Sequence, residues 1–212
     1  MKREDSTSHY SDIIKIFSDP KGYRKWYEIH EIAYENEKRT VERLGLSDCL
    51  DIGSGPGIFH EVLRGNTISF DISEAMLKEV EGDRVVGEAH YLPFRDNSIP
   101  CVFVSVTICF LKDLETFMKE VWRVVKKDIG ICIIARDSPW GELYESLGRQ
   151  GHKYYSKANF ISKEELIELV SKYFNIVEIF STLRYRPFEE DKLEEPIEGL
   201  DGSFICIRGK KG

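Results

Sequence analysis

The segment 51–57 reads DIGSGPG, an acid followed by glycines at every second position, directly after the apolar approach of Cys49 and Leu50. Glycine lets a backbone adopt positive φ and come close to a ligand. If the segment joins a strand to a helix, the free N–H groups at the start of that helix suit a carboxylate or a phosphate. The sequence therefore predicts a binding site here, and the alternative is a tight turn that holds no ligand.

The spacing of these glycines decides between ligand classes. A dinucleotide site has the pattern G-x-G-x-x-G, whereas this chain has G-x-G-x-G followed by Ile58. A P-loop is excluded because no Gly-Lys-Ser or Gly-Lys-Thr follows. Asp71 ends a second apolar run about 20 residues after Asp51, where an acid accepts both hydroxyls of a ribose. The pattern predicts a ribose-containing ligand without a pyrophosphate, and a nicotinamide-dependent oxidoreductase is only a distant alternative.

Alternating strands and helices must position these residues. We expect strands over 49–53, 67–71, 84–88, 101–110 and 129–137, with helices over 57–65, 73–82, 113–127 and 162–173. Such alternation is typical of a parallel sheet with helices on both faces. Two further strands, 175–183 and 202–209, have no helix between them and give the sheet an antiparallel end. The predicted fold is α/β, with a mostly parallel seven-stranded sheet.

Two segments lie outside this alternation. Residues 10–44 read as helical with a break at 18–22, and aromatic side chains recur there at helical spacing. The segment 138–160 is aromatic and reads as irregular. We therefore expect an N-terminal helical cap over 1–44 and a ligand-binding domain over 45–212, in which 138–160 is an insert that completes the cap.

Composition excludes several other classes. The net charge of −7 repels phosphate backbones, so nucleic acid is not expected as a partner. The chain shows neither a signal peptide nor a membrane span, so we expect a cytoplasmic protein, either a monomer or a homodimer. The odd cysteine count and the lack of a C-x-x-C pair predict buried, reduced thiols, and the scattered histidines predict no metal site.

Four motifs together resemble a known family. LDIGSGPG, FDISEAML, GEAHYLPFRDNS and EVWRVVKKDIG occur in this order between residues 45 and 136. In this order the chain resembles the class I S-adenosylmethionine-dependent methyltransferases, in particular the type 11 small-molecule branch that includes quinone-biosynthesis C-methyltransferases. The resemblance implies a Rossmann-like methyltransferase fold and S-adenosylmethionine as the cofactor, with S-adenosylhomocysteine as the product.

The resemblance also implies roles for single residues. Asp51 lies beside the methionine part of the cofactor, Asp71 holds the ribose hydroxyls, Ile72 packs on the adenine, and Glu88 lies at the adenine edge. The end of the fourth strand passes beside the sulfonium. The full set of expected cofactor-binding residues is Asp51, Gly53, Ser54, Gly55, Gly57, Asp71, Ile72, Met76, Glu88, Ala89, Val104, Ser105, Val106 and Thr107.

The acceptor is expected between the strand ends and the cap. Methyl transfer needs mainly proximity and a water-poor site, and a base only when the acceptor is protonated. We expect His30, His152 and Tyr23 as candidates for catalysis. Aromatic candidates for binding the acceptor are Trp26, Tyr27, Tyr34, Trp140 and Tyr155. The alternative for each of these residues is that it packs the cap onto the domain, and we expect His60 to face solvent.

The predicted function is methyl transfer from S-adenosylmethionine to a small aromatic or apolar acceptor. One alternative is a cofactor-binding regulatory or scaffold subunit without activity, because fold alone does not settle function. Another is a protein or RNA methyltransferase, for which the basic residues near the two ends give little support. Methyltransferases of amide or amino nitrogens resemble each other in an Asn/Asp-Pro-Pro-Tyr motif after the fourth strand. This chain has VSVTICF at that place, which disfavours a methyltransferase of amino nitrogens in DNA bases.

Overall fold

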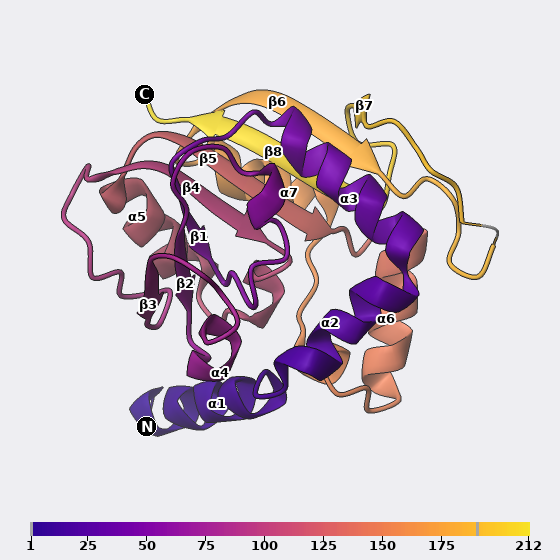
Figure 1. Cartoon of the computed structure of the whole chain (residues 1–212), viewed down its shortest axis with the longest axis horizontal. Coiled ribbons are helices and arrows are strands. Elements are labelled where there is room, and N and C mark those ends of the chain that lie inside the picture. The colour runs from indigo at the N-terminus through magenta and orange to yellow at the C-terminus, as the bar shows by residue number, and fades with distance from the viewer. Residues whose placement is uncertain (1, 190) are drawn as a thin grey trace.

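A mixed eight-stranded sheet forms the centre of the protein (Figure 1). The computed structural model describes residues 2–189 and 191–212, with side chains from His9 onward. The strand order is β3-β2-β1-β4-β5-β8-β6-β7. The strands are β1 Cys49–Ile52, β2 Ile68–Asp71, β3 Arg84–Val86, β4 Ile99–Ser105, β5 Val125–Ile134, β6 Asn175–Thr182, β7 Ile197–Glu198 and β8 Phe204–Lys210.

The pairing of the strands confirms a mostly parallel sheet with an antiparallel end. β1 pairs in parallel with β2 and β4, and Leu50 lies opposite Ile68 on one side and Val102 on the other. β8 runs antiparallel between β5 and β6. The expected number of strands was too small by one, because the two-residue strand β7 pairs with the edge of β6 inside a segment that reads as an acidic loop.

Seven α-helices accompany the sheet in the described part of the chain. They are α1 Lys2–Ile16, α2 Pro20–Ile29, α3 Glu31–Arg43, α4 Glu74–Leu77, α5 Leu114–Val124, α6 Pro139–Arg149 and α7 Lys163–Ser171. Short 3-10 helices follow the glycine loop at His60–Val62, the end of β4 at Ile108–Phe110, and α6 at Tyr155–Lys157. Among the described helices, none has the length and apolar character needed to cross a membrane.

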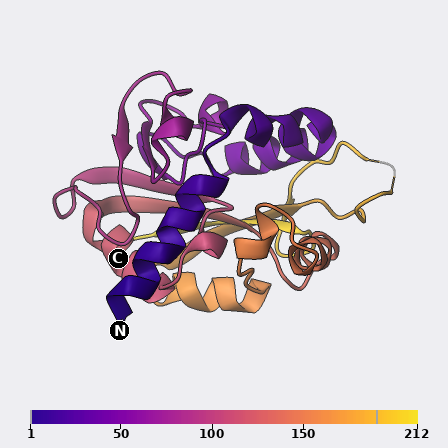
Figure 2. The ribbon, with the colours of Figure 1, turned by 90° about the horizontal axis from the view of Figure 1, so that it is seen from below.

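Helices cover both faces of the sheet (Figure 2). On one face, side chains of α5 and α7 pack on the strands, among them Phe117, Val121, Leu166 and Val170. On the other face, α3 and α6 pack on the strands through Val41, Trp140 and Tyr144. Helix α1 lies outside these two layers and runs along one end of the sheet in both views. The central strands are therefore buried on both sides, as their apolar composition requires.

Several local predictions differ from the structure. The segment 138–160 contains the regular helix α6, where Ser138 accepts a hydrogen bond from the Gly141 N–H and Pro139 starts the helix. A serine cap followed by proline is a common helix start, so the start of α6 could have been recognised from the sequence. The helix expected over 57–65 is reduced to a 3-10 turn, and the helix expected over 73–82 to the four residues of α4.

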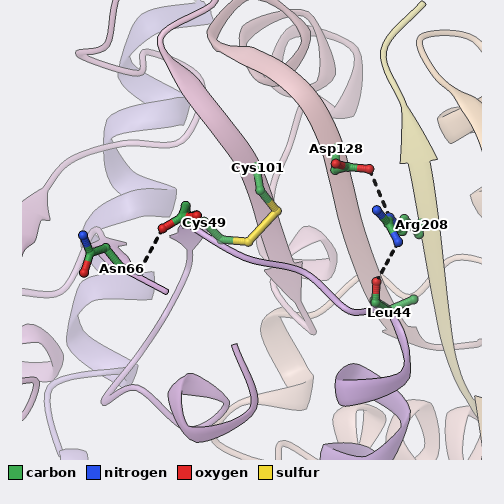
Figure 3. Close-up of a disulfide and its surroundings, with 7 residues drawn as sticks. Leu44, Cys49, Asn66, Cys101, Asp128 and Arg208 are labelled. Atoms are coloured by element: carbon green, nitrogen blue, oxygen red, sulfur yellow. Dashed lines mark hydrogen bonds and ion pairs between the residues drawn. A yellow bond between two sulfur atoms is a disulfide. The ribbon is translucent and has the colours of Figure 1, made fainter. Parts of the chain in front are cut away.

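Cysteines on one face of the sheet form two disulfides. Cys49 of β1 bonds to Cys101 of β4 (Figure 3), and Cys132 of β5 bonds to Cys206 of β8. All five cysteines are buried, as expected, but the expectation of reduced thiols was wrong, and only Cys109 is free. Each bonded pair lies directly opposite in neighbouring strands. The strand register brings together two cysteines that are 52 positions apart in the first pair and 74 positions apart in the second. Spacing in the sequence could not reveal this pairing.

Candidate functional site

The glycine loop turns sharply after β1 and folds back against β2. Gly53, Gly55 and Gly57 have φ of 72°, 53° and 77°, a region that side chains rarely adopt. The Gly53 and Ser54 N–H groups donate to the Phe70 carbonyl at 2.7 and 3.2 Å. A Cβ at Gly53 would collide with the side chain of Thr107. Glycine is therefore required at position 53 by both backbone angle and space.

Asp71 closes the loop from the end of β2. Its Oδ2 accepts a hydrogen bond from the Gly55 N–H at 2.8 Å, and its Oδ1 accepts one from the Ser73 N–H at 2.8 Å. The side chain is almost buried, and this burial raises the pKa of Asp71 against the opposing effect of the two backbone donors. The carboxylate is thus held in a fixed orientation where the loop meets β2.

Asp51 lies behind the loop and pairs with a histidine. His60 Nε2 is 3.1 Å from Asp51 Oδ2, and Asp51 is 3% exposed. Burial raises the pKa of Asp51, and the contact with His60 opposes this rise. A Cβ at Gly57 would lie 2.9 Å from the His60 ring, so this glycine makes room for the pair. The expectation that His60 faces solvent was wrong, because the 3-10 turn directs the ring inward.

A cavity of about 80 Å³ lies between the glycine loop and the ends of β2 and β4. Eight of the expected cofactor-binding residues line it: Gly53, Gly55, Asp71, Ile72, Glu88, Ala89, Val106 and Thr107. The other six lie outside the lining, and most of them are buried behind it: Asp51, Ser54, Gly57, Met76, Val104 and Ser105. The eight lining residues together form one wall of the cavity.

The opposite wall comes from α1, the turn after it and the start of α2, which the cofactor motifs do not include. Its residues are Tyr10, Ile13, Phe17 and Tyr23. Ser73 Oγ donates to the Phe17 carbonyl at 2.7 Å and so ties the end of α1 to the start of α4. The cavity is smaller than the roughly 300–1,000 Å³ of ordinary ligand sites, because these side chains close over it.

Glu88 is held at the edge of this cavity by a neighbouring histidine. Glu88 Oε1 accepts a hydrogen bond from the His90 backbone N–H at 3.0 Å and is in close contact with His90 Nδ1. Tyr10 Oη lies 3.0 Å from the same ring nitrogen. Burial opposes the charged form of His90, but the Glu88 carboxylate outweighs it and raises the pKa of His90. α1 is thereby linked to the residue expected at the adenine edge.

A second cavity, of about 280 Å³, adjoins the first. The two share Phe17, Tyr23, Val106 and Phe110 as a common wall. Val106 has a φ of 48°, which is rare for a β-branched residue and stores about 1–3 kcal/mol of strain. Its N–H donates to the Cys132 carbonyl at 2.9 Å, which fixes this backbone between the cavities. We call the second cavity the aromatic cavity, because its lining is Phe17, Gly22, Tyr23, Lys25, Trp26, Tyr27, Ile29, Glu37, Val106, Phe110, Ile134, Tyr144, His152, Tyr154 and Tyr155.

The structure brings two of the three expected catalytic residues to the aromatic cavity. Tyr23 Oη lies 3.2 Å from Tyr27 Oη, and burial raises the pKa of both phenols, which keeps them neutral. His152 stacks on Tyr155 with ring centroids 4.3 Å apart, and burial lowers the pKa of His152. His30 instead packs on Trp26 and lies outside the linings of both cavities.

The expected acceptor-binding residues divide in the same way. Trp26, Tyr27 and Tyr155 line the aromatic cavity. Tyr34 lies outside it and donates to the Ile58 carbonyl at 2.6 Å. Trp140 is buried in the core and donates from Nε1 to the Tyr185 carbonyl at 3.0 Å.

Glu37 is a lining residue that sequence reasoning missed. It lies on α3, is 3% exposed and lines the aromatic cavity. Burial raises its pKa to about 8. One signal was available in the sequence, because Glu37 follows Tyr23, Tyr27 and Tyr34 on the helical segment whose aromatic face was recognised.

Comparisons with known proteins agree with this geometry. Residues 50–134 match the type 11 methyltransferase domain family. An uncharacterised protein of Methanocaldococcus jannaschii is 31% identical over 196 residues, 89% of this chain and 95% of that protein. A ubiquinone/menaquinone biosynthesis C-methyltransferase of Rickettsia felis is 26% identical over 85% of this chain and 82% of its own length. A crystal structure from Thermotoga maritima, described as an S-adenosylmethionine-dependent methyltransferase and possible histamine N-methyltransferase, shares 31% identity and a TM-score of 0.85 over 93% of this chain and 99% of that one.

The fold, the glycine loop and these similarities define a class I methyltransferase. The chain belongs to the S-adenosylmethionine-dependent methyltransferases, in the type 11 group, and S-adenosylmethionine is its cofactor. The residues present fit that cofactor. A fixed carboxylate faces a cavity that also has a glycine cradle and the apolar side chains of Phe70 and Ile72.

Proposed function

We propose that this methyltransferase acts on a small acceptor with an aromatic or apolar frame, bound in the aromatic cavity. The observation that carries the proposal is the wall of Tyr23, Val106 and Phe110 shared by the two cavities. An acceptor on one side of this wall lies next to a cofactor on the other. The names of two similar proteins, a quinone C-methyltransferase and a possible histamine N-methyltransferase, both concern small ring compounds.

Each group of residues has a proposed role toward the cofactor. Bound S-adenosylmethionine supplies an electrophilic methyl group on a sulfonium. Asp71 accepts hydrogen bonds from the ribose hydroxyls, and the Gly53 and Gly55 backbone lies against the methionine part. Ile72 and Ala89 flank the adenine. Tyr10 of α1 and Phe17 just after it exclude water from the cofactor cavity, which strengthens electrostatic interactions within it.

The aromatic cavity supplies proximity and a dry environment for the acceptor. Trp26, Tyr27 and Tyr155 provide flat faces on which a ring can stack, at centroid distances like those that the protein's own rings adopt. His152 lies at the same cavity, and its lowered pKa keeps the imidazole neutral and able to accept a proton.

This arrangement supports a division of the chain into a cap and a cofactor-binding domain. We propose that residues 1–44 form a cap that closes both cavities and that the region of α6 completes the acceptor side. α1, α2 and the turn between them contribute Tyr10, Tyr23 and Phe17 to the linings. We propose a small molecule as the partner and the cytoplasm as the location.

Methyl transfer to a panel of acceptors tests the function. The protein is incubated with methyl-labelled S-adenosylmethionine and small aromatic acceptors, and labelled products are separated from the protein. We expect turnover with at least one aromatic acceptor, and a loss of at least tenfold in kcat/KM when Tyr155→Ala opens the aromatic cavity. Tyr91→Ala is the matched control, because that ring is 77% exposed and lies outside the aromatic cavity. Equal losses in both variants contradict the proposed acceptor site.

A further inference from the structure

A buried acid without a partner lines the aromatic cavity. Glu37 is 3% exposed, and within the described part of the chain its carboxyl group makes neither a hydrogen bond nor an ion pair. Burial of an ionised carboxylate without a partner costs several kcal/mol. Burial therefore favours the protonated acid, and an occupant that supplies a positive charge would stabilise the carboxylate.

The surroundings of Glu37 suit a cation. Aromatic faces attract cations through their electron-rich centres, and rings from three parts of the chain enclose this cavity. Among the described residues of the lining, Glu37 is the only acid. The titratable and charged groups around it are Tyr23, Lys25 and Tyr27 of α2, Tyr34 of α3, Tyr144 of α6, His152, Tyr154 and Tyr155 of the segment after α6, and Tyr185 after β6.

Glu37 is the group in this lining that changes charge near neutral pH, because its titratable neighbours keep their charge state there. Burial, together with the Glu37 charge, raises the pKa of Tyr23, Tyr27, Tyr144 and Tyr155, so these phenols stay neutral. Burial lowers the pKa of His152, which keeps it neutral above pH 6.5. Lys25 is exposed and contributes a positive charge only at the rim.

We propose that the acceptor is a small amine with an aromatic or apolar frame, an inference that rests on the proposed function. It enters the aromatic cavity as an ammonium cation, and Glu37 is its counter-ion and proton acceptor. A neutral acceptor would leave the buried carboxylate without a compensating charge, and an anionic acceptor would be repelled by it. An ammonium cation satisfies both the carboxylate and the aromatic faces.

The proton step is balanced within the cavity. An ammonium nitrogen has no lone pair, so it must lose a proton before it can accept a methyl group. One N–H bond breaks, and its electron pair stays on nitrogen. The proton forms an O–H bond on Glu37. The lone pair then forms the new nitrogen–carbon bond as the sulfur–carbon bond breaks, with that electron pair remaining on sulfur. The proton on Glu37 leaves to solvent after the product departs.

Calorimetry with matched probes tests the proposal. The protein is saturated with S-adenosylhomocysteine and titrated at pH 8 with 2-phenylethylamine, and separately with the neutral isostere 2-phenylethanol. We expect the amine to bind at least tenfold more tightly than the alcohol. Glu37→Gln should abolish this preference, while Glu35→Gln, on the same helix but in a half-buried pair with Lys38 outside the cavity, should retain it. Equal affinities for amine and alcohol in the unaltered protein overturn the proposal.

The titration separates this proposal from the proposed function. Absence of S-adenosylhomocysteine binding would count against the cofactor site itself. Binding of S-adenosylhomocysteine without a preference for the amine would remove only the role of Glu37.

If Glu37→Gln fails to fold, the unaltered protein still decides. Ammonium binding requires an ionised Glu37, so the amine affinity should rise about tenfold per pH unit up to about pH 8 and then level off. A rise that continues toward pH 10, where ordinary alkylamines lose their proton (pKa about 10.4 for lysine), would mean that the neutral amine binds without Glu37 and would overturn the proposal.

Discussion

The substitution Glu37→Gln should change how the stability of the protein depends on pH. The pKa of Glu37 is about 8 in the folded protein, compared with an ordinary value of 4.5. The folded state therefore binds this proton more tightly than the unfolded state. Its stabilising contribution is fully present below pH 4.5 and is lost as the pH rises toward 8. Glutamine keeps the shape of the side chain and does not titrate.

The size of the effect follows from the interval of pH. One pH unit within the window corresponds to about 1.4 kcal/mol. From pH 4.5 to 7 the unaltered protein should therefore lose about 3 kcal/mol of unfolding free energy relative to Glu37→Gln. The difference between the two proteins cancels the contributions of other titrating groups, as long as those groups lie far from Glu37.

Urea denaturation at pH 4.5, 6, 7 and 8 measures this difference. Glu35→Gln is the control, because the hydrogen bond with Lys38 lowers the pKa of Glu35 and gives its pH dependence the opposite sign. A difference between Glu37→Gln and the unaltered protein that stays constant over this range would refute the reasoning. It would mean that the Glu37 carboxylate is already solvated or paired in the folded protein.

Three further perturbations test other parts of the structure. Gly53→Ala should abolish S-adenosylhomocysteine binding in calorimetry, because the added Cβ collides with Thr107. The control Gly82→Ala, at a glycine with φ of +93° and open space around it, should retain binding. Loss of binding in both variants would contradict the role of the glycine loop in holding the cofactor. Asn36→Ala should lower the unfolding free energy by about 2–3 kcal/mol in urea, because its amide bonds to the backbone at 192–194 at 2.7 Å; an unchanged midpoint would contradict this. Alkylation of the denatured, unreduced protein should label Cys109 alone by mass spectrometry, and five labelled thiols would contradict the disulfides.

The sequence predicted the parts of the fold that have local signals. The apolar strands, the capping box of Ser162 and Glu165, and the Ser73 cap all form as expected. The acid at the end of β2 and the glycines after β1 lie at one cavity because parallel strands end at the same edge of the sheet. Spacing along the chain is sufficient for such a site, since it depends on only two neighbouring strands.

The acceptor side depended on contacts that spacing does not encode. Glu37, Tyr144 and Tyr155 come from α3, α6 and a 3-10 turn, and they meet only after the sheet has formed. The sequence indicated aromatic residues in these segments but could not tell Tyr155, which lines the cavity, from Trp140, which is in the core. The disulfides were missed for the same reason, because register between distant strands pairs their cysteines.

The central claim is that the loop after β1 and Asp71 bind the nucleoside of S-adenosylmethionine. Calorimetric titration with S-adenosylhomocysteine tests it most directly, because the product is not consumed. The unaltered protein should bind with micromolar affinity. Asp71→Ala should weaken binding at least tenfold, about 1.4 kcal/mol or more, while the exposed control Asp83→Ala should bind as the unaltered protein does. Folded Asp71→Ala protein that binds with unchanged affinity, or unaltered folded protein that does not bind, would contradict the claim.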